Sequence, residues 1–384
     1  MKYIFLFIFL YILTIRTFSQ EIKVNLFYGF NLKTLVIKLT EGKYELVNEN
    51  DKTIKLKKTN VLYFTVIGDS LSVWDLDDHI GLFKSVKITH KSKHNEFRIE
   101  PSYPALTERK YEGDLFLENR DSSIVVINHI ELEKYVAGVV ESESGPKAPE
   151  EYYKSQAIIC RTYALDHLNR HINEGFHLCD DVHCQVYKSR SYQNDTIIQA
   201  TFATKGLVIT DTAFNLITAA FHSNSGGQTN NSEDVWSTET SYLKSVVDTF
   251  AFNLHHSTWK DSITIAEWMN YLDTSGIKID RNNFSAKHYE YDQTMRSKYL
   301  FFNGDSIPLK KIRSDFGFKS TFFSTQIKNG YIYFNGKGYG HGVGLSQESA
   351  MKMARLGYSY YEIITFFYQN IRIVNVDYVD IEFP

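Results

Sequence analysis

The sequence predicts an α+β protein in which a β-rich N-terminal region is followed by a mixed α/β domain. Between residue 21 and about residue 125, apolar and polar residues alternate between turn signals, which is the period of strands with one buried face. From Leu132 onward, apolar residues recur every three or four positions, which is the period of a helix. Strand-like runs then return at residues 206–210 and 217–221. These changes of period define the predicted fold class.

Two helices are expected after the β-rich region. In the first, Val136, Val139 and Val140 fall on one face, and this helix must end before Gly145. The second is expected to begin at Pro149 and to close near residue 175.

Further elements are expected in the second half of the chain. A short helix is predicted near residues 265–272, and a strand at residues 331–334. Another helix is predicted from Ser346 to about residue 357. The last helix is predicted at residues 359–367, where a serine and a glutamate three positions later form a capping box.

The N-terminus has the composition of a secretory signal peptide at residues 1–20. Lys2 precedes an almost wholly apolar run from residue 4 to residue 15, and the small residue Ser19 lies near the end. The run is too short to span a membrane comfortably, and no other segment approaches its length. The alternative is an uncleaved anchor. We therefore expect an exported protein of the periplasm or cell envelope, without a further transmembrane anchor.

The overall charge argues against nucleic acid as a partner. The chain holds 42 Lys and Arg against 45 Asp and Glu, a formal net charge of −3. Removal of the first twenty residues, which contain Lys2 and Arg16 but no acid, leaves 40 basic and 45 acidic residues and a net charge of −5. General affinity for nucleic acid would require a basic surface instead.

Two thiols and two imidazoles lie close together at residues 177–184. Cys179 and Cys184 alternate with His177 and His183, and His171 lies a little upstream. Two cysteines and two histidines complete a tetrahedral zinc set, and four protein ligands leave no open position, so such a zinc would be structural. In an exported protein, a short-loop disulfide and free thiols are the other two states open to these cysteines. The residues alone do not decide among the three.

Two loops rich in small residues, at residues 222–229 and 336–347, each present histidine with hydroxyl or amide groups. Alternate glycines in the second loop remove Cβ atoms, which would let a polar ligand approach the main chain. Neutral donors and acceptors with few fixed charges suit a sugar better than a phosphate. A dinucleotide is excluded, because His341 and Val343 stand where its fingerprint requires glycine.

Glu143 is the candidate general acid. It lies at the end of its helix on the apolar face defined by Val136 and Val139, where partial desolvation would raise its pKa and favour the protonated form. A protonated carboxyl is what glycosidic cleavage requires. Glu141 points nearly to the opposite side of the same helix. The alternative for Glu143 is an ordinary helix-end carboxylate in water.

Several segments occur in the order typical of one protein family: residues 132–140 with Glu143, 154–164, 184–187, 222–229, 232–236, 242–243 and 338–347. In these segments the chain resembles the SpoIID/LytB family, which comprises stage II sporulation protein D and amidase-enhancer proteins. The resemblance covers about residues 95–375. It therefore divides the chain into the signal peptide, a β-rich region (21–95), a SpoIID-like catalytic domain (96–375) and a C-terminal tail (376–384).

The resemblance implies a peptidoglycan lytic transglycosylase that acts on glycan strands stripped of their stem peptides. The family's catalytic glutamate falls on Glu143, which would protonate the oxygen between N-acetylmuramic acid and N-acetylglucosamine. It would then accept the proton of the muramoyl O6 as that oxygen closes onto C1 to give a 1,6-anhydro product. The family's usual Glu-Met-Pro is replaced here by Glu143-Ser144-Gly145, with the proline one place later at Pro146.

The remaining expectations concern ligands and partners. The zinc found in some relatives would be held here by His177, Cys179, His183 and Cys184, with His171 as the alternative to His177. Peptidoglycan glycan strands are the expected partner, and an N-acetylmuramoyl-L-alanine amidase is a second one if the chain is a non-catalytic enhancer. The residues expected to bind substrate are Gln156, Arg161, His222, Ser223, Ser225, Gln228, Tyr339, His341, Ser346 and Gln347.

Overall fold

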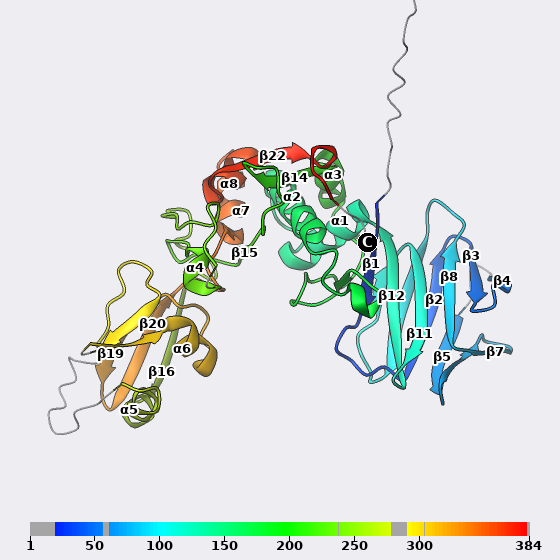
Figure 1. Ribbon diagram of the computed structural model, residues 1–384, viewed down its shortest axis with the longest axis horizontal. Coiled ribbons are helices and arrows are strands. Elements are labelled where there is room, and N and C mark those ends of the chain that lie inside the picture. The colour runs from blue at the N-terminus through cyan, green and yellow to red at the C-terminus, as the bar shows by residue number, and fades with distance from the viewer. Residues whose placement is uncertain (1–19, 57–60, 237, 278–289, 303, 382–384) are drawn as a thin grey trace, which may run out of the picture.

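The computed structural model describes residues 20–56, 61–236, 238–277, 290–302 and 304–381. The predicted signal peptide lies outside these ranges except for Gln20. The α+β prediction is confirmed, and the described residues form three lobes in a row (Figure 1). We call them the sandwich lobe (20–131), the central lobe (132–257 and 338–381) and the distal lobe (258–337). Across these ranges, no helix combines the length and apolar character that a membrane span requires.

The sandwich lobe consists of two antiparallel sheets that enclose one core. Its strands are β1 (Glu21–Leu26), β2 (Thr34–Glu41), β3 (Tyr44–Asn48), β4 (Thr53–Leu56), β5 (Val61–Ile67), β6 (Ser70–Trp74), β7 (His79–Phe83), β8 (Ser85–His90), β9 (Glu96–Tyr103), β10 (Arg109–Tyr111), β11 (Asp114–Arg120) and β12 (Ser123–Glu131). One sheet has the order β1-β12-β11-β8-β3-β4, and the other β10-β9-β2-β5-β6-β7. Alternate residues of β2 are buried, as the period of two predicts.

The sandwich lobe extends beyond the predicted boundary at residue 95, which is therefore wrong. β9 pairs with β2, and β12 pairs with β1 along its length. The strands after residue 95 are thus required to complete both sheets. The boundary was misplaced because strand pairing joins residues about a hundred positions apart, whereas the family resemblance reports only similarity along the chain.

The central lobe is built around α2. Its elements are α1 (Leu132–Ser144), α2 (Glu150–Asp166), η1 (Ile172–Glu174), β13 (Leu178–Cys179), α3 (Asp195–Ala203), β14 (Leu207–Asp211), β15 (Phe221–His222), α4 (Ser232–Val235), β21 (Leu345–Ser346), α7 (Gln347–Arg355), α8 (Tyr360–Phe367), β22 (Ile371–Asn375) and η3 (Val376–Tyr378). α2 packs against α1, α3, α7 and α8. It ends at Asp166, earlier than the predicted residue 175. β13 adds to the edge of β1, which ties this lobe to the sandwich.

The distal lobe has its own hydrophobic core, which the sequence did not distinguish from the rest of residues 96–375. Its elements are β16 (Thr258–Thr264), α5 (Ile265–Thr274), β17 (Tyr299–Phe302), β18 (Asp305–Pro308), α6 (Leu309–Phe316), β19 (Phe323–Lys328) and β20 (Tyr331–Lys337). β20 lies between β16 and β19, and Trp268 and Phe334 are buried between this sheet and the helices. The lobe lies at the opposite end of the molecule from the sandwich (Figure 1).

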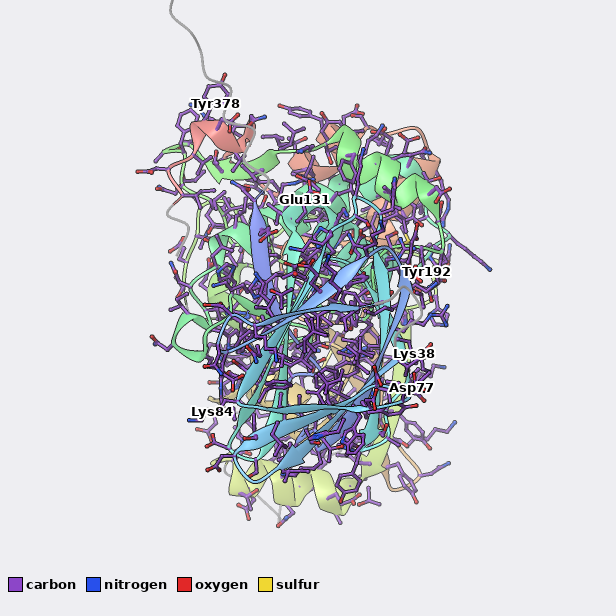
Figure 2. All side chains as sticks on the ribbon, turned by 90° about the vertical axis from the view of Figure 1, so that its right-hand side faces the viewer. Lys38, Asp77, Lys84, Glu131, Tyr192 and Tyr378 are labelled. Carbon is purple, nitrogen blue, oxygen red and sulfur yellow. The ribbon has the colours of Figure 1, made fainter. Side chains whose placement is uncertain are left out.

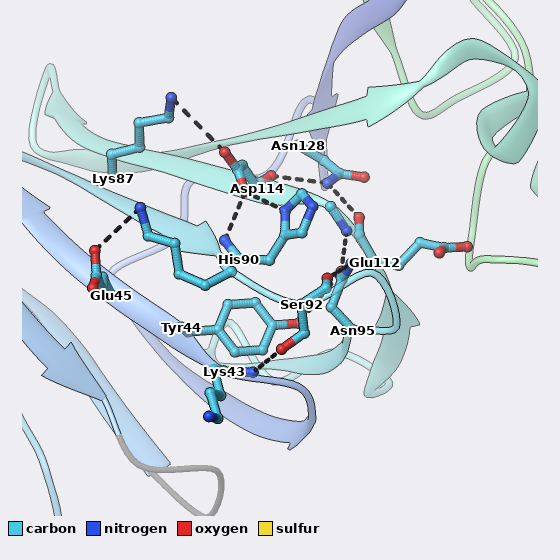
Figure 3. Close-up of polar contacts among 12 residues, drawn as sticks. Lys43, Tyr44, Glu45, Lys87, His90, Ser92, Asn95, Glu112, Asp114 and Asn128 are labelled. Carbon is cyan, nitrogen blue, oxygen red and sulfur yellow. Dashed lines mark hydrogen bonds and ion pairs between the residues drawn. The ribbon is translucent and has the colours of Figure 1, made fainter. Parts of the chain in front are cut away.

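A polar network joins strands of the sandwich lobe (Figure 3), and Lys134 connects it to α1. The Asp114 carboxylate accepts hydrogen bonds from the backbone N–H of His90 (2.8 Å) and from its ring Nδ1 (2.6 Å). The Asn128 amide donates to the backbone carbonyls of Glu112 (2.9 Å) and Asp114 (3.0 Å). The Glu112 carboxylate then pairs with Lys134 in the first turn of α1 (2.6 Å). The start of the helix that carries Glu143 is therefore fixed to β11 and β12.

The end of β12 nearest the central lobe is visible when the sandwich lobe faces the viewer (Figure 2). Seen from that side, Glu131 at the end of β12 lies toward the helices of the central lobe, whereas Asp77 and Lys84 lie toward the opposite end of the strands (Figure 2). The chain thus leaves the sandwich at the end nearest α1.

A fully buried ion pair joins α1 to α2. Arg161 donates through Nε to Glu133 Oε1 (2.9 Å) and through Nη2 to Glu133 Oε2 (2.5 Å). The same guanidinium donates to the carbonyls of Leu207 (3.0 Å) and Thr201 (3.2 Å). Because Arg161 is buried and occupied in this way, the prediction that it binds substrate is wrong. Its charge serves to join α1, α2, α3 and β14.

We expect Arg161→Met to destabilise the protein by about 3–5 kcal/mol, since it leaves Glu133 buried without its counterion. Denaturant unfolding measures this directly. Lys154→Met is the matched control, because Lys154 lies on the same helix and its pairs with Glu150 and Glu151 are partly exposed; its cost should stay below about 1 kcal/mol. If Arg161→Met kept its stability but lost glycan binding, Arg161 would be a substrate-binding residue after all.

Candidate active site

The two polar loops predicted from the sequence lie side by side. β15 pairs in parallel with β21, so that Phe221 faces Leu345 and His222 faces Ser346. Further along, Asn224 and Tyr339 exchange backbone hydrogen bonds of 3.1 and 2.8 Å. Two segments more than a hundred residues apart therefore form one surface.

The glycines of the second loop are required by this pairing. Gly338 has φ +75°, and a Cβ atom there would lie 2.5 Å from the carbonyl oxygen of Asn224. Gly344 has φ +69°, and its Cβ would overlap the carbonyl oxygen of Ala220. The space freed by the missing side chains is thus filled by the facing protein backbone. The expectation that a ligand would occupy it is wrong at these positions.

Two of the predicted ligand-contacting serines belong to a buried network. Ser225 and Ser349 donate their hydroxyls to the Asp248 carboxylate, at 2.6 and 2.7 Å. The Ser346 hydroxyl lies 2.9 Å from that of Ser349 and accepts the backbone N–H of Ser225 (3.2 Å). Ser225 and Ser346 are fully buried, so their prediction as substrate contacts is wrong. Their hydroxyls connect the two loops by hydrogen bonds below the protein surface.

Arg296, which the sequence did not single out, braces the first loop. It donates through Nη2 to the carbonyl of Ser225 (2.7 Å) and through Nε to that of Gln228 (2.5 Å). The Gln228 side chain accepts the backbone N–H of Arg296 (2.8 Å) and donates to Ser245 (2.9 Å). Gln228 is therefore engaged within the protein at both ends of its amide.

Ser223 is half-buried beside a histidine and a glutamate that the sequence analysis missed. The Ser223 hydroxyl lies 3.1 Å from His256 Nδ1, and Glu348 Oε1 lies 2.8 Å from the same nitrogen. In a serine-nucleophile relay the hydroxyl and the carboxylate bond opposite ring nitrogens. Because both approach one nitrogen here, this group does not form such a relay.

His341 has intramolecular partners at both ring nitrogens. Nε2 donates to the carbonyl of Phe221 (2.9 Å), and Nδ1 accepts the backbone N–H of Val343 (3.1 Å). Burial, reinforced by the charge of Arg313, lowers the pKa of His341 to about 4. A single neutral tautomer satisfies both contacts. His341 thus braces the loop, and a ligand contact, which stays a prediction, would have to use its ring face.

His222 is buried next to His341, with ring centroids 5.6 Å apart. Its Nδ1 donates to the carbonyl of Val343 (3.1 Å), whereas its Nε2 has no partner among the described residues. Burial lowers the pKa of His222 well below its ordinary value. Of the two histidines, His222 is the one that retains a free ring nitrogen.

Glu143 lies in the last turn of α1, as predicted. Its Oε1 accepts the backbone N–H of Val186 (3.0 Å), and Oε2 has no hydrogen-bond partner in the part of the chain that the structure describes. Burial raises the pKa of Glu143, and the Val186 amide opposes part of this rise. The turn after it is fixed by the Tyr153 hydroxyl, which donates to the Gly145 carbonyl (2.9 Å) and accepts the Ala148 N–H (2.8 Å).

Glu141 lies on the other side of α1, as the helical period predicts, but it is buried. Its carboxylate accepts the Ser191 hydroxyl (3.0 Å) and the backbone N–H groups of Tyr192 (3.2 Å) and Gln193 (3.0 Å). Glu141 therefore holds the segment that follows Val186 against the end of α1.

Two buried glutamine side chains, Gln156 and Gln185, contact the Cys160 thiol, which lies near Glu143. Gln156 Nε2 donates to Cys160 Sγ (3.5 Å), and the charge of Glu143 contributes to raising the pKa of that thiol. Gln156 Oε1 and Gln185 Nε2 have no partner among the described residues, and Gln347 Nε2 on α7 has none either. Gln156 is fully buried, but its Oε1 is unpaired among the described residues, and the expected substrate contact there stays a prediction. Gln185, in the segment after the cysteines, was not singled out.

The thiols and imidazoles gather as a Cys/His cluster formed by His171, Cys179, His183 and Cys184. The Cys184 sulfur lies 3.5 Å from His171 Nε2 and 3.9 Å from His183 Nδ1, and the Cys179 sulfur lies 3.8 Å from His183 Nδ1. Tetrahedral zinc bonds place sulfur and nitrogen roughly 3.6 Å apart. Both cysteines are free thiols in this structure. The four side chains therefore fit a closed zinc site.

The orientation of His171 fits the same site. Its Nδ1 lies 2.5 Å from the Glu174 carboxylate, which leaves Nε2 to face the Cys184 sulfur. His177, predicted as the fourth ligand, lies outside the cluster, and this prediction is wrong. The backbone N–H of Lys23 donates to its Nδ1 (3.3 Å), because the start of β13 is held against β1. His171 was the alternative that the sequence left open.

The chain is similar in sequence to several known proteins. The family described as "SpoIID: Stage II sporulation protein" matches residues 120–210, which contain Glu143 and the Cys/His cluster. Stage II sporulation protein D of Bacillus subtilis is 30% identical over 268 residues, or 65% of this chain and 76% of that protein. Its counterpart in Bacillus amyloliquefaciens is 28% identical, over 75% of this chain and 86% of that protein. An amidase enhancer of Bacillus subtilis is 28% identical, over 60% of this chain but only 39% of its own length.

We expect about one zinc per chain in protein purified without chelator. His171→Ala should lose the metal and His177→Ala should retain it, since only the first removes a side chain of the cluster. Elemental analysis measures the metal, and mass spectrometry under non-reducing conditions measures any Cys179–Cys184 bridge. Metal retained in His171→Ala, or absent from the unaltered protein together with a bridge, would contradict the assignment.

We expect Glu141→Gln to lower thermal stability more than Glu143→Gln. The new amide NH2 at position 141 would face donors where an acceptor is needed, at a cost of roughly 1–3 kcal/mol. At position 143 only one hydrogen bond is involved. Thermal midpoints of the two variants, measured side by side, test this. A larger loss for Glu143→Gln would mean that Glu143 is the structural carboxylate.

Proposed function

The chain belongs to the SpoIID family, and on that premise we propose that it is an exported lytic transglycosylase. Its substrate would be peptidoglycan glycan strands stripped of stem peptides, cleaved between N-acetylmuramic acid and N-acetylglucosamine. The family and the similarity to an amidase enhancer support a cell-wall-related function in general. The specific reaction rests on the surroundings of Glu143.

The observation that carries the proposal is the isolation of the Glu143 carboxyl. Its raised pKa results from burial, opposed only by the Val186 amide, and no other carboxylate of the described residues contributes. Glycosidases of the usual kind need two carboxyl groups flanking the bond. A lone carboxyl with a raised pKa suits a reaction in which one group is first acid and then base.

In the proposed reaction, protonated Glu143 donates its proton to the glycosidic oxygen as the bond to C1 of the muramic acid breaks. The resulting carboxylate then accepts the proton of the O6 hydroxyl as O6 bonds to C1. The product is a 1,6-anhydromuramoyl end, and Glu143 returns to its protonated form. No water or second carboxylate is needed, because the nucleophile belongs to the same sugar.

The Cys/His cluster would support Glu143 from a distance. Cys184 is two residues before Val186, whose amide binds Glu143, and Lys188 donates its backbone N–H to Ser142 on α1 (3.2 Å). A zinc held by the cluster would therefore fix the segment that sets the position and pKa of the catalytic carboxyl. It would supply no chemistry, because the four protein ligands close its coordination shell.

The second candidate is a non-catalytic glycan-binding protein that enhances a cell-wall amidase. The similarity to an amidase enhancer favours it. So does the displaced proline after Glu143, because Ser144 and Gly145 stand where the family has methionine and proline, and Gly145 has φ +67°, which proline cannot adopt. The two candidates differ in whether the isolated protein releases anhydro products.

We expect Glu143→Gln to reduce cleavage of peptide-stripped strands by roughly a hundredfold or more, since an amide can neither donate nor accept the reacting proton. Mass spectrometry of the products measures release of 1,6-anhydro ends, and co-sedimentation with the strands measures binding. Binding should be largely retained. Full activity in Glu143→Gln would eliminate the catalytic role, and no cleavage by the unaltered protein would favour the enhancer.

The pH dependence of cleavage gives an independent expectation. The carboxyl must be protonated for the first step, so kcat/KM should fall as the pH rises through the pKa of Glu143. Because burial raises that pKa, this fall should occur at a higher pH than for an exposed glutamate. A profile that is flat across the whole range above pH 4 would contradict the general-acid role.

A further inference from the structure

A cavity of 450 Å³ lies where the distal lobe meets the second polar loop, away from Glu143. Its lining residues come from α4, from α6 and the turn that follows it, and from the glycine-rich loop. They are Val235, Lys310, Arg313, Ser314, Gly317, Phe318, Lys319, Thr321, Tyr339 and His341. The cavity therefore includes two residues predicted to bind substrate, Tyr339 and His341.

The charge of this cavity is unbalanced. Lys310, Arg313 and Lys319 line it, and no carboxylate is among the lining residues. By contrast, a second basic cavity, of 540 Å³ between β9, β10 and the segment 188–193, has its positive charges balanced by carboxylates. Each of its cations is paired: Arg98 with Glu108, Arg109 with Asp180, Lys110 with Glu96, and Lys188 with Asp181.

The carboxylates nearest in sequence to the first cavity are engaged elsewhere. On α4, Glu233 pairs with Lys244 (2.9 Å) and Asp234 accepts a hydrogen bond from Asn231 (3.0 Å). On α6, Asp315 pairs with Lys311 (2.5 Å). Within the described ranges, none of the three cations of the cavity forms an ion pair. Their combined charge therefore faces the cavity.

Arg313 is the central cation of this group. It is half-buried, and its Nε donates to the carbonyl of Phe318 (3.2 Å), while its two terminal nitrogens have no acceptor among the described residues. Burial lowers the pKa of Arg313, and its charge also lowers the pKa of His341. An unpaired, partly buried guanidinium is costly to maintain, and an anionic ligand would offset that cost.

Aromatic rings flank the cations. Tyr339 is 39% exposed, and its ring centre lies 5.6 Å from Lys319 Nζ. Trp236 is 43% exposed, with its ring 5.2 Å from that of His341. Exposed aromatic faces beside a few polar groups are typical of a ligand site. The combination suits a sugar ring that carries one negative charge.

We propose that this cavity binds the free carboxylate of the lactyl ether on a muramic acid residue, with Arg313 and Lys319 as the recognising cations. The proposal rests on the proposed function, since it concerns the same glycan substrate. In an intact strand this carboxyl is bound in the amide that begins the stem peptide, and it has no charge. Removal of the peptide exposes a carboxylate, which a guanidinium can bind through two parallel hydrogen bonds. The cavity would thus select strands from which the peptide has been removed.

The test uses the Glu143→Gln protein, so that strands are bound without being cleaved. Its affinity is measured for peptide-stripped strands and for the same strands after conversion of the lactyl carboxylates to methylamides. We expect the stripped strands to bind roughly tenfold to a hundredfold more tightly, the range of one charge-assisted contact. Lys319→Gln in this background should abolish most of the difference, and Arg313→Lys should reduce it because the planar fork is lost.

Lys311→Gln is the matched control, because it removes one positive charge from α6, the helix that carries Arg313, and Lys311 lies outside the cavity and is already paired with Asp315. It should leave the preference unchanged. Circular dichroism confirms that each variant is folded. Competition with N-acetylmuramic acid, N-acetylglucosamine and inorganic phosphate identifies the anion, and only the first should compete well.

The outcomes separate this proposal from the proposed function. Equal binding of stripped and methylamidated strands, with cleavage intact in the unaltered protein, would overturn the carboxylate site and leave the transglycosylase standing. Stronger competition by phosphate than by N-acetylmuramic acid would also overturn it. A preference that Lys311→Gln removes as fully as Lys319→Gln would show general attraction rather than a site. No cleavage by the unaltered protein would count against the proposed function alone.

Discussion

The parallel pairing of Phe221–His222 with Leu345–Ser346 is the contact on which the candidate site depends. Side chains at Gly338 or Gly344 would force the two loops apart, because the facing carbonyls of Asn224 and Ala220 occupy that space. The buried Asp248 holds hydroxyls from both sides of the pair. Small residues here thus permit backbone to meet backbone, and the polar side chains left at the surface take their positions from that contact.

The position of Glu143 depends on a second set of long-range contacts. α1 is fixed at its start by Lys134 and Glu112, and at its end by the segment 186–193, which binds Glu143, Ser142 and Glu141 in turn. The Cys/His cluster lies just before that segment. A carboxyl whose protonation is set by burial must be held where water cannot reach it freely. The sandwich lobe, through Glu112, and the segment 186–193 supply that restraint.

Local patterns were sufficient to predict several of the elements. The helical face of Val136 and Val139, its end before Gly145, and the capping box at Ser359 all appear in the structure. Glu143 falls on that face and its pKa is raised. These features depend on residues three or four positions apart, so the sequence alone contains them. The sandwich boundary was misplaced because it depends on β9 and β12 finding strands much earlier in the chain.

The substrate contacts were predicted less well, for a physical reason. Arg161, Ser225 and Ser346 are polar residues in conspicuous motifs, but polar residues in motifs also satisfy buried partners, and these three do. Sequence gives residue type and not the direction of a side chain. The choice between His171 and His177 failed similarly, because pairing of β13 with β1 turns His177 away from the thiols. The neutral loops also suggested an uncharged ligand, whereas α6 adds cations from an unconnected segment.

The distal lobe leaves the central lobe and returns to it at adjacent points, since Thr258 at the start of β16 is paired with Lys337 at the end of β20. The lobe is therefore an insertion with its own core and with joined ends. Apart from Arg296, which braces the first loop, its interior and outer surface can vary in sequence without moving the loops to which it is attached. Under the proposed function, evolution could in this way change which polymer the protein accepts while leaving Glu143 untouched, so that recognition and chemistry would be separately adjustable parts of one chain.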